Sequence, residues 1–222
     1  MRASLHAGIA LASVAVGLPA IAQTAIVAES AAPADGACQI HVWATNDPKS
    51  YLGSFSAAFG GGALGGLLDA QLPNNKAMTA LVKEVFTARR QAELLARQDL
   101  AKRLGMPGAV IVLHDKATEE SGWKNAKAAR LTPTTGACYA EVQVRHSYFV
   151  KASIFPPEVR SNYTLRDFRS GKLVETLGRG STRLTIDTAP GQEPRATLVE
   201  ALEDGFAAAF NEYLTEKGFN GA

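Results

Sequence analysis

The chain has 222 residues, of which 23 are Lys or Arg and 21 are Asp or Glu, so its formal net charge is +2. This near-neutral balance does not indicate a nucleic-acid binder, because contacts to a phosphate backbone need a surplus of basic residues. Hydrophobic residues make up 46% and charged residues 20%, which are ordinary values for a globular protein with its own core.

The first 22 residues have the three parts of a cleavable secretory signal peptide of the bacterial type. Arg2 supplies the positive charge, residues 7–18 supply a short apolar stretch, and Ala20-Ile21-Ala22 is an A-x-A cleavage site. The apolar stretch is short for a membrane span of roughly 20 residues, although an uncleaved N-terminal anchor stays open as an alternative. The pattern predicts a periplasmic or secreted protein whose mature chain begins near Gln23.

The first half of the mature chain contains a lead-in, a strand, a glycine-rich segment and a long helix. Residues 23–37 are small and Ala-rich, which predicts a flexible lead-in. A strand is expected over 38–44, and residues 50–69 form a Gly-rich segment without charge before Asp69. Apolar residues that repeat at three and four predict an amphipathic helix from 76 to 104.

The second half begins with a continuous apolar run over 109–114, which is typical of a strand buried on both faces. Alternation predicts a strand over 139–151, and residues 162–169 and 172–177 predict a hairpin. A final helix is expected over 196–217, with a buried stripe of Leu198, Leu202, Phe206, Phe210, Tyr213 and Leu214.

The order of these elements predicts a single α/β domain over residues 38–218. Its fold is a two-layer sandwich, in which a mixed sheet of about five strands carries a long helix and an amphipathic C-terminal helix.

The two cysteines, Cys38 and Cys138, both lie in the mature part of the chain. An even pair in an oxidising compartment predicts a disulfide bond, with two separate thiols as the alternative. Gly-Ala precedes each cysteine, and each cysteine stands at the start of a predicted strand. If these starts are bonded, the two strands run parallel as close neighbours, because antiparallel neighbours would place the starts at opposite ends.

The predicted hairpin Tyr163-Thr-Leu-Arg-Asp-Phe-Arg-Ser-Gly-Lys-Leu-Val-Glu-Thr-Leu-Gly-Arg-Gly and the helix after it resemble a pattern of envelope proteins. Residues 160–217 are similar to the periplasmic domain of the curli-secretion subunit family and to the N-terminal domain of the TolB family. The N-terminal half departs from both families, and no functional residue can be transferred. The resemblance implies a non-enzymatic role in envelope assembly.

Two features are candidate interaction surfaces. Within the Gly-rich segment, glycines four positions apart allow two helices to approach closely, which predicts self-association or contact with a membrane. The alternatives are a helix packed tightly inside the domain and a surface loop. These glycines are Gly61, Gly62, Gly65 and Gly66. On the long helix, Arg89 and Arg90 belong to a basic face that could contact anionic lipid. Interspersed acidic residues favour instead a solvent-exposed face with salt bridges.

Three histidines follow the signal peptide, and each falls on a predicted strand. They are His41, His114 and His146. Neighbouring strands could bring them together as a zinc or copper site. No close ligand spacing connects them, so structural histidines are the favoured interpretation, and neither a metal nor a cofactor is predicted.

No hydrolase motif is present in the sequence. The favoured function is therefore an exported structural or accessory protein of the cell envelope, not an enzyme, that binds another envelope protein or a membrane surface. Oligomerisation is expected through the Gly-rich segment. Two alternatives stay open: a metal-binding or hydrolytic enzyme built on the three histidines, and a carrier of a small apolar ligand in a pocket under the long helix.

Overall fold

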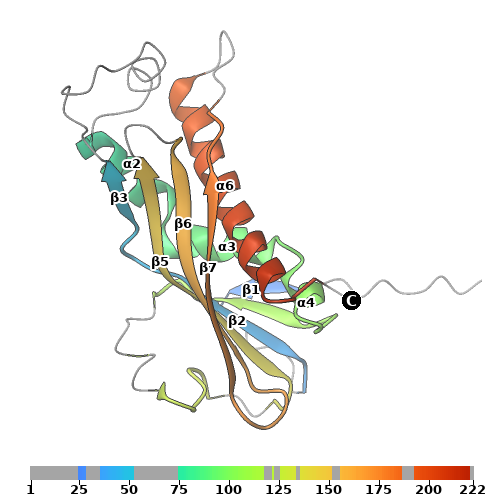
Figure 1. Cartoon of the computed structure of the whole chain (residues 1–222). Coiled ribbons are helices and arrows are strands. Elements are labelled where there is room, and N and C mark those ends of the chain that lie inside the picture. Colours follow the sequence, from blue (N-terminus) through green and yellow to red (C-terminus); the bar gives the residue numbers. More distant parts are fainter. Residues whose placement is uncertain are drawn as a thin grey trace, which may run out of the picture.

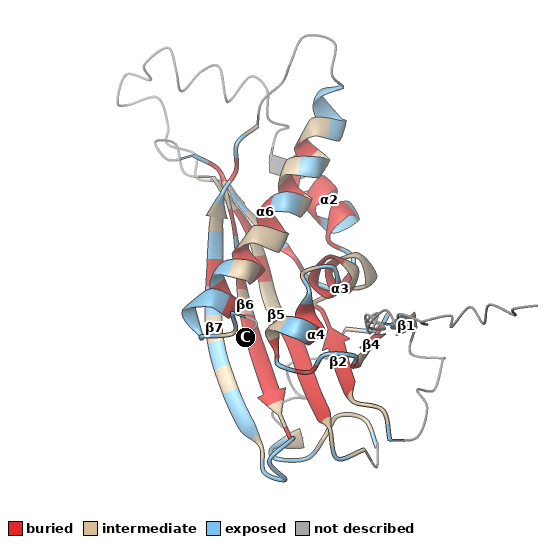
Figure 2. Cartoon of the chain, turned by 90° about the vertical axis from the view of Figure 1, so that its right-hand side faces the viewer, coloured by how far each residue is buried: buried red, intermediate tan, exposed pale blue. Residues whose placement is uncertain are grey.

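A mixed sheet of seven strands carries the helices on one of its faces, as Figures 1 and 2 show. The predicted α/β sandwich is therefore confirmed, with seven strands instead of about five. The two additional strands are β1 (Ile26–Ala28) and β3 (Lys49–Leu52). The computed structural model describes residues 25–28, 36–52, 75–117, 122, 126–133, 136–151, 156–186 and 193–220.

The strands follow the order β1–β4–β2–β5–β6–β7, and β3 pairs with the far end of β5. β2 (Gln39–Trp43) lies between β4 (Val110–Leu113) and β5 (Tyr139–Lys151), and runs parallel to both. The parallel pairing of the two strands that begin at the cysteines is thus confirmed. β6 (Glu158–Asp167) and β7 (Val174–Arg183) then continue the sheet in antiparallel order.

Strand β1 lies inside the segment 23–37, for which the sequence predicts a flexible lead-in. Over these three residues that prediction is wrong, because Ile26 and Ala28 pair in parallel with Ile111 and Leu113 of β4. The N–H of Ile111 donates to the carbonyl of Ala25 at 2.8 Å. The strand forms because β4 offers an unpaired edge, which is a tertiary effect that local composition does not reveal.

The predicted helix over 76–104 is divided into three: α2 (Asn75–Val85), α3 (Ala88–Ala96) and α4 (Leu100–Arg103). Thr87 ends the first by adopting an extended backbone, and its hydroxyl accepts the N–H of Arg90 as an N-cap. Asp99 separates the other two in a left-handed conformation with φ of 50°. The apolar spacing continues through both breaks, which explains why periodicity alone predicts one helix.

A β-bulge in β5 determines which side chains of this strand face the helices. The register with β6 shifts between Val144 and His146, which leaves one extra residue on β5. Val144 is buried in the core before the bulge, whereas Ser147 and Phe149 are the fully buried residues after it. Tyr148 therefore points away from the helices, although uninterrupted alternation predicts that it shares the face of Val144.

Helix α6 (Pro194–Glu216) packs along β6 and β7, and all six residues of its predicted apolar stripe are buried (Figure 2). It approaches β7 closely at Gly180, where a side chain would collide with the backbone of Ala209. Gly218, with φ of 80°, follows the last turn and ends the helix as predicted. The helix layer thus covers one face of the sheet. The opposite face, called the outer face below, carries none of the helices α2, α3, α4 and α6.

Candidate functional site

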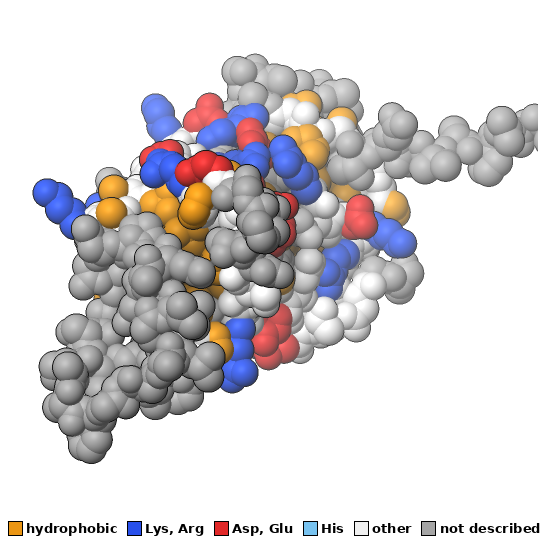
Figure 3. Space-filling model, turned by 90° about the horizontal axis from the view of Figure 1, so that it is seen from above, with side chains coloured by type: hydrophobic (Ala, Val, Ile, Leu, Met, Phe, Trp, Pro, Cys, Tyr) orange, Lys and Arg blue, Asp and Glu red, His pale blue; other side chains and the backbone are white. Residues whose placement is uncertain are grey.

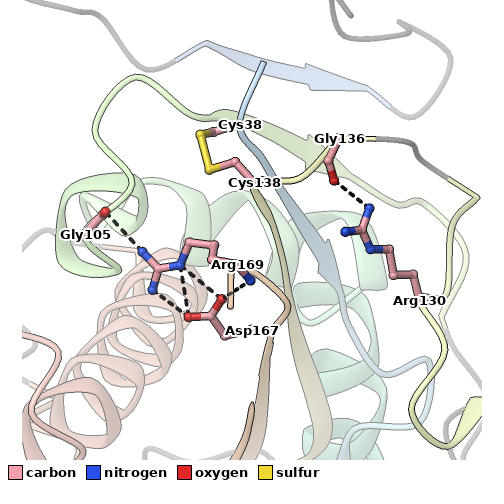
Figure 4. The surroundings of a disulfide bond; sticks show 7 residues. All are labelled: Cys38, Gly105, Arg130, Gly136, Cys138, Asp167 and Arg169. Atoms are coloured by element: carbon pink, nitrogen blue, oxygen red, sulfur yellow. Dashed lines mark hydrogen bonds and ion pairs between the residues drawn. A yellow bond between two sulfur atoms is a disulfide. The ribbon is translucent and has the colours of Figure 1, made fainter. Parts of the chain in front are cut away.

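A disulfide bond joins Cys38 and Cys138 at the starts of β2 and β5, with 4.6 Å between their Cα atoms (Figure 4). The predicted pairing is confirmed. Two arginines donate to backbone carbonyls nearby, Arg169 to Gly105 at 3.1 Å and Arg130 to Gly136 at 2.7 Å. The disulfide bond therefore holds the starts of β2 and β5 together at a point where several connecting segments meet.

The structure brings two of the three candidate histidines together. Nδ1 of His41 lies 2.8 Å from Nε2 of His114, and both side chains are buried. His146 is separate, because it pairs with Asn162 beyond the bulge, whereas His41 pairs with Glu141 before it. Within the described part of the chain, no group of three or more His, Cys, Asp or Glu residues could hold a metal ion. The described residues thus form no three-histidine metal site.

Hydrogen bonds decide where the proton of His41 lies. Its Nε2 is 3.0 Å from the side-chain oxygen of Gln39, so Nε2 donates and Nδ1 accepts the proton of His114 Nε2. Burial, and secondly the nearby His114, lower the pKa of His41 from 6.5 to about 3. His41 is therefore neutral at pH 7.

A buried ion pair lies beside the histidines on the outer face. Arg166 of β6 donates to Glu141 of β5 at 2.7 Å, and the two side chains are 1% and 0% exposed. The hydroxyl of Tyr139 donates to the same carboxylate at 2.8 Å. We call His41, His114, Tyr139, Glu141 and Arg166 the buried network.

The buried network holds a connecting segment, residues 126–133, against the outer face. Arg166 donates to the carbonyls of Lys127 and Ala129, and the N–H of Leu131 donates to Glu141. Burial is the larger effect on Glu141 and raises its pKa, while the donors Leu131, Tyr139 and Arg166 act in the opposite direction. The carboxylate depends on these donors to be charged, so the network is suited to anchoring this segment.

We predict that acid weakens the fold through His41. Because the pKa is lowered in the folded state, the unfolded chain binds the extra proton as the pH falls from 6.5 towards 3. Between about pH 7.5 and about pH 5 the unfolding free energy should fall by about 2 kcal/mol through this group. Urea unfolding at both pH values, compared with His41→Gln, measures the contribution.

His146→Gln is the matched control, since it removes a histidine of the same face outside the buried network. The unfolding free energy of His146→Gln should depend on pH as that of the natural chain does. Between the two pH values, the unfolding free energy of His41→Gln should fall by about 2 kcal/mol less than that of the natural chain. Equal pH dependence in the natural chain and in His41→Gln would contradict the assignment.

An open groove of about 700 Å³ lies on the other half of the outer face. We call it the outer groove. Its aromatic wall consists of Tyr51 from β3 and Tyr148 from β5, whose ring centres are 5.6 Å apart. Tyr51 is 52% exposed. The residues that line the groove are Tyr51, Tyr148, Val150, Arg160, Asn162, Arg179, Gly180 and Ser181.

The outer groove is basic, because two arginines and no acidic residue are among the described residues that line it. Arg160 forms an ion pair with Glu158, its neighbour on the same face of β6. Arg179 forms no ion pair with any residue that the structure describes. An anionic ligand would therefore meet positive charge on both β6 and β7.

None of the residues that line the outer groove belongs to a functional site predicted from the sequence. A signal was present in β6, where Arg160 and Asn162 alternate with the buried Val159, Ser161 and Tyr163. Such alternation indicates an exposed sheet face. Tyr148 could not be placed in this way, because the bulge in β5 reverses the alternation.

The predicted interaction residues Arg89 and Arg90 lie on α3 and form salt bridges with acidic residues. Arg89 pairs with Glu93 at 2.8 Å and with Asp115 at 3.0 Å, and Arg90 pairs with Glu203 at 2.6 Å. In Figure 3, basic and acidic side chains are correspondingly interspersed. This pattern matches the interpretation of a solvent-exposed face with salt bridges.

Two further predictions concern segments that lie outside the described residues. One is the signal peptide at 1–22, and the other is the group of Gly61, Gly62, Gly65 and Gly66 in the Gly-rich segment. Only residues 50–52 of that segment are described, and they belong to β3. None of the helices in the described part of the chain has both the length and the apolar character that crossing a membrane requires.

Comparisons with known proteins assign no family. No family model matches the chain, and no curated protein matches it. A solved hypothetical protein of Chlamydia trachomatis is similar at 10% identity and a TM-score of 0.33, covering 83% of this chain and 97% of its own. An uncharacterised protein is similar at 10% identity and a TM-score of 0.35, covering 88% of this chain and 99% of its own. Neither likeness indicates an activity.

Proposed function

We propose that this chain is an exported protein of the cell envelope that acts by binding another envelope component through the outer groove. The observation that carries the proposal is the groove itself, which is open, basic and lined by tyrosine and arginine. Tyrosine and arginine are the residue types that contribute most to binding energy at recognition surfaces.

The contrast between the two halves of the outer face supports binding over catalysis. The imidazole of His41 and the carboxylate of Glu141 are buried beneath the segment 126–133 and do not line the outer groove. The described lining of the groove offers aromatic rings, guanidinium groups, an amide and a hydroxyl, and it includes no histidine, cysteine or carboxylate that would activate the hydroxyl. The disulfide bond supports export, since such bonds persist in oxidising compartments.

The carrier of an apolar ligand is supported less well. Its pocket is expected under the helix layer, yet the side chains there form the packed core, with Met78, Leu95 and Leu100 fully buried. The outer groove lies on the opposite face of the sheet, and its lining combines two guanidinium groups, an amide and a hydroxyl with its aromatic rings.

Fractionation of cells that express the full chain tests the proposal. We expect the protein in the periplasmic and envelope fractions, with Cys38 and Cys138 resistant to alkylation until a reductant is added. Part of it should stay with the envelope after osmotic shock, and the double variant Tyr51→Ala/Arg179→Gln should be released more readily. Arg195→Gln, which removes an exposed ion pair with Glu84 on the helix side, is the control and should behave like the natural chain.

Two outcomes would contradict the proposal. A cytoplasmic protein with freely alkylated cysteines would exclude export. Equal retention of the double variant and the natural chain would exclude the outer groove as the binding surface.

A further inference from the structure

We infer that the outer groove binds a saccharide chain that carries carboxylate groups. The inference rests on the proposed function and names the class of ligand for the same groove. It follows from three properties of the lining as far as the structure describes it: adjacent aromatic rings, hydrogen-bonding groups in neighbouring cross-strand pairs, and arginines without an acidic residue.

The aromatic wall suits a sugar ring. The rings of Tyr51 and Tyr148 are inclined by 38° to each other, and each combines an apolar ring with a hydroxyl at its tip. A pyranose has the same dual character, because its C–H groups form an apolar face and its hydroxyls form a polar rim. Val150 is the one aliphatic side chain among the described lining residues, so a purely apolar ligand would leave the groove's arginine, asparagine and serine side chains unpaired.

The floor of the groove presents hydrogen-bonding groups in a regular arrangement. Arg160 lies opposite Ser181, and Asn162 lies opposite Arg179, in successive outward-facing pairs of β6 and β7. Side chains in such pairs have Cβ atoms roughly 5 Å apart. The amide of Asn162 and the hydroxyl of Ser181 both donate and accept, as sugar hydroxyls require. A planar guanidinium binds a carboxylate through two parallel hydrogen bonds.

The charge of the groove favours an acidic saccharide over a neutral one. Arg179 has no ion-pair partner among the described residues, and a neutral ligand that covers it would remove water without replacing the lost interaction. Just outside the groove, Arg183 lies opposite Glu158 on the same face, so its charge is balanced there by that carboxylate. A protein partner matches this open groove less well. The residues that contribute most to protein–protein binding usually insert into pockets from which water is fully excluded.

Calorimetric titration of the mature, oxidised protein with short oligomers of galacturonic acid tests the inference, because each ring of this probe carries one carboxylate. Oligomers of galactose are the matched neutral probe. We expect saturable binding of the acidic oligomer, about tenfold or more tighter than binding of the neutral one. Arg179→Gln should lower the affinity for the acidic oligomer by about 10- to 100-fold, because it removes a hydrogen bond to a charged group.

Arg183→Gln is the charge-matched control, since it removes the same charge from the same strand and face outside the groove. It should change the affinity by less than about twofold. Tyr51→Ala should lower the affinity for both oligomers, because it removes the stacking surface and leaves the charge of the groove unchanged. Unfolding curves that superimpose on that of the natural chain verify that each variant is folded.

Three results would overturn the inference. They are an absence of binding by the folded natural protein, equal weakening by Arg179→Gln and Arg183→Gln, and equally tight binding of a poly-glutamate peptide. If the protein is retained by the envelope but fails these titrations, the ligand class is wrong and the proposed function stands. If it is neither exported nor retained, the proposed function fails first.

Discussion

Replacing both cysteines, as in Cys38→Ser/Cys138→Ser, is expected to lower the unfolding free energy by about 4–5 kcal/mol. The bond joins residues that are 100 positions apart, so it removes a large loop entropy from the unfolded chain. It also links two directly paired parallel strands, β2 and β5, whose association otherwise has to overcome that loop entropy. Urea unfolding of the oxidised natural chain and of the double variant measures the difference.

Reduction provides an internal control for this prediction. Dithiothreitol should lower the stability of the natural chain to that of the double variant, and it should leave the double variant unchanged. A loss of less than about 1 kcal/mol would mean that the unfolded chain is already compact around this pair, which contradicts the entropic argument.

Arg166→Met is expected to cost about 3–5 kcal/mol, because it leaves Glu141 as an unpaired charge in a fully buried position. The change also removes the donor to the carbonyls of Lys127 and Ala129, which hold the segment 126–133. Hydrogen exchange should therefore increase in that segment before it increases in the sheet. Chemical unfolding and hydrogen exchange measured on the same variant test both statements.

Two further variants separate buried charge from other effects. Adding Glu141→Leu to Arg166→Met should recover part of the loss, because no unpaired charge then remains in the core, although the Leu131 N–H and the carbonyls of Lys127 and Ala129 still lack their partners. Arg169→Gln breaks a pair of similar geometry with Asp167 that is 35% and 24% exposed, and should cost less than about 1 kcal/mol. If Arg166→Met costs no more than Arg169→Gln, burial of the pair does not have the importance that we assign to it.

Some of the sheet could be predicted without the structure because its signals are local or are carried by the chain itself. The apolar run of β4 predicts burial on both faces, and its residues Ile111, Val112 and Leu113 are buried. The repeated Gly-Ala-Cys predicts that two strands are parallel neighbours, and the disulfide and the pairing of β2 with β5 confirm this.

The candidate sites were less predictable, because they depend on contacts between distant segments. Glu141 and Arg166 alternate with apolar residues in their strands, which normally indicates a solvent-exposed face. They are buried because the segment 126–133 covers this half of the outer face. His41 and His114 likewise meet through the pairing of β2 with β4, and no short motif connects them.

The sequence by itself determined the elements whose apolar pattern is uninterrupted: the periodic stripe of α6, the continuous apolar run of β4 and the hairpin of β6 and β7. Only the tertiary structure decided the exceptions, which are the breaks at Thr87 and Asp99, the bulge in β5 and the added strand β1. The reason is physical. Periodicity records which face of an element is apolar, whereas caps, bulges, edge pairing and the burial of a charge are stabilised by residues far away in the chain.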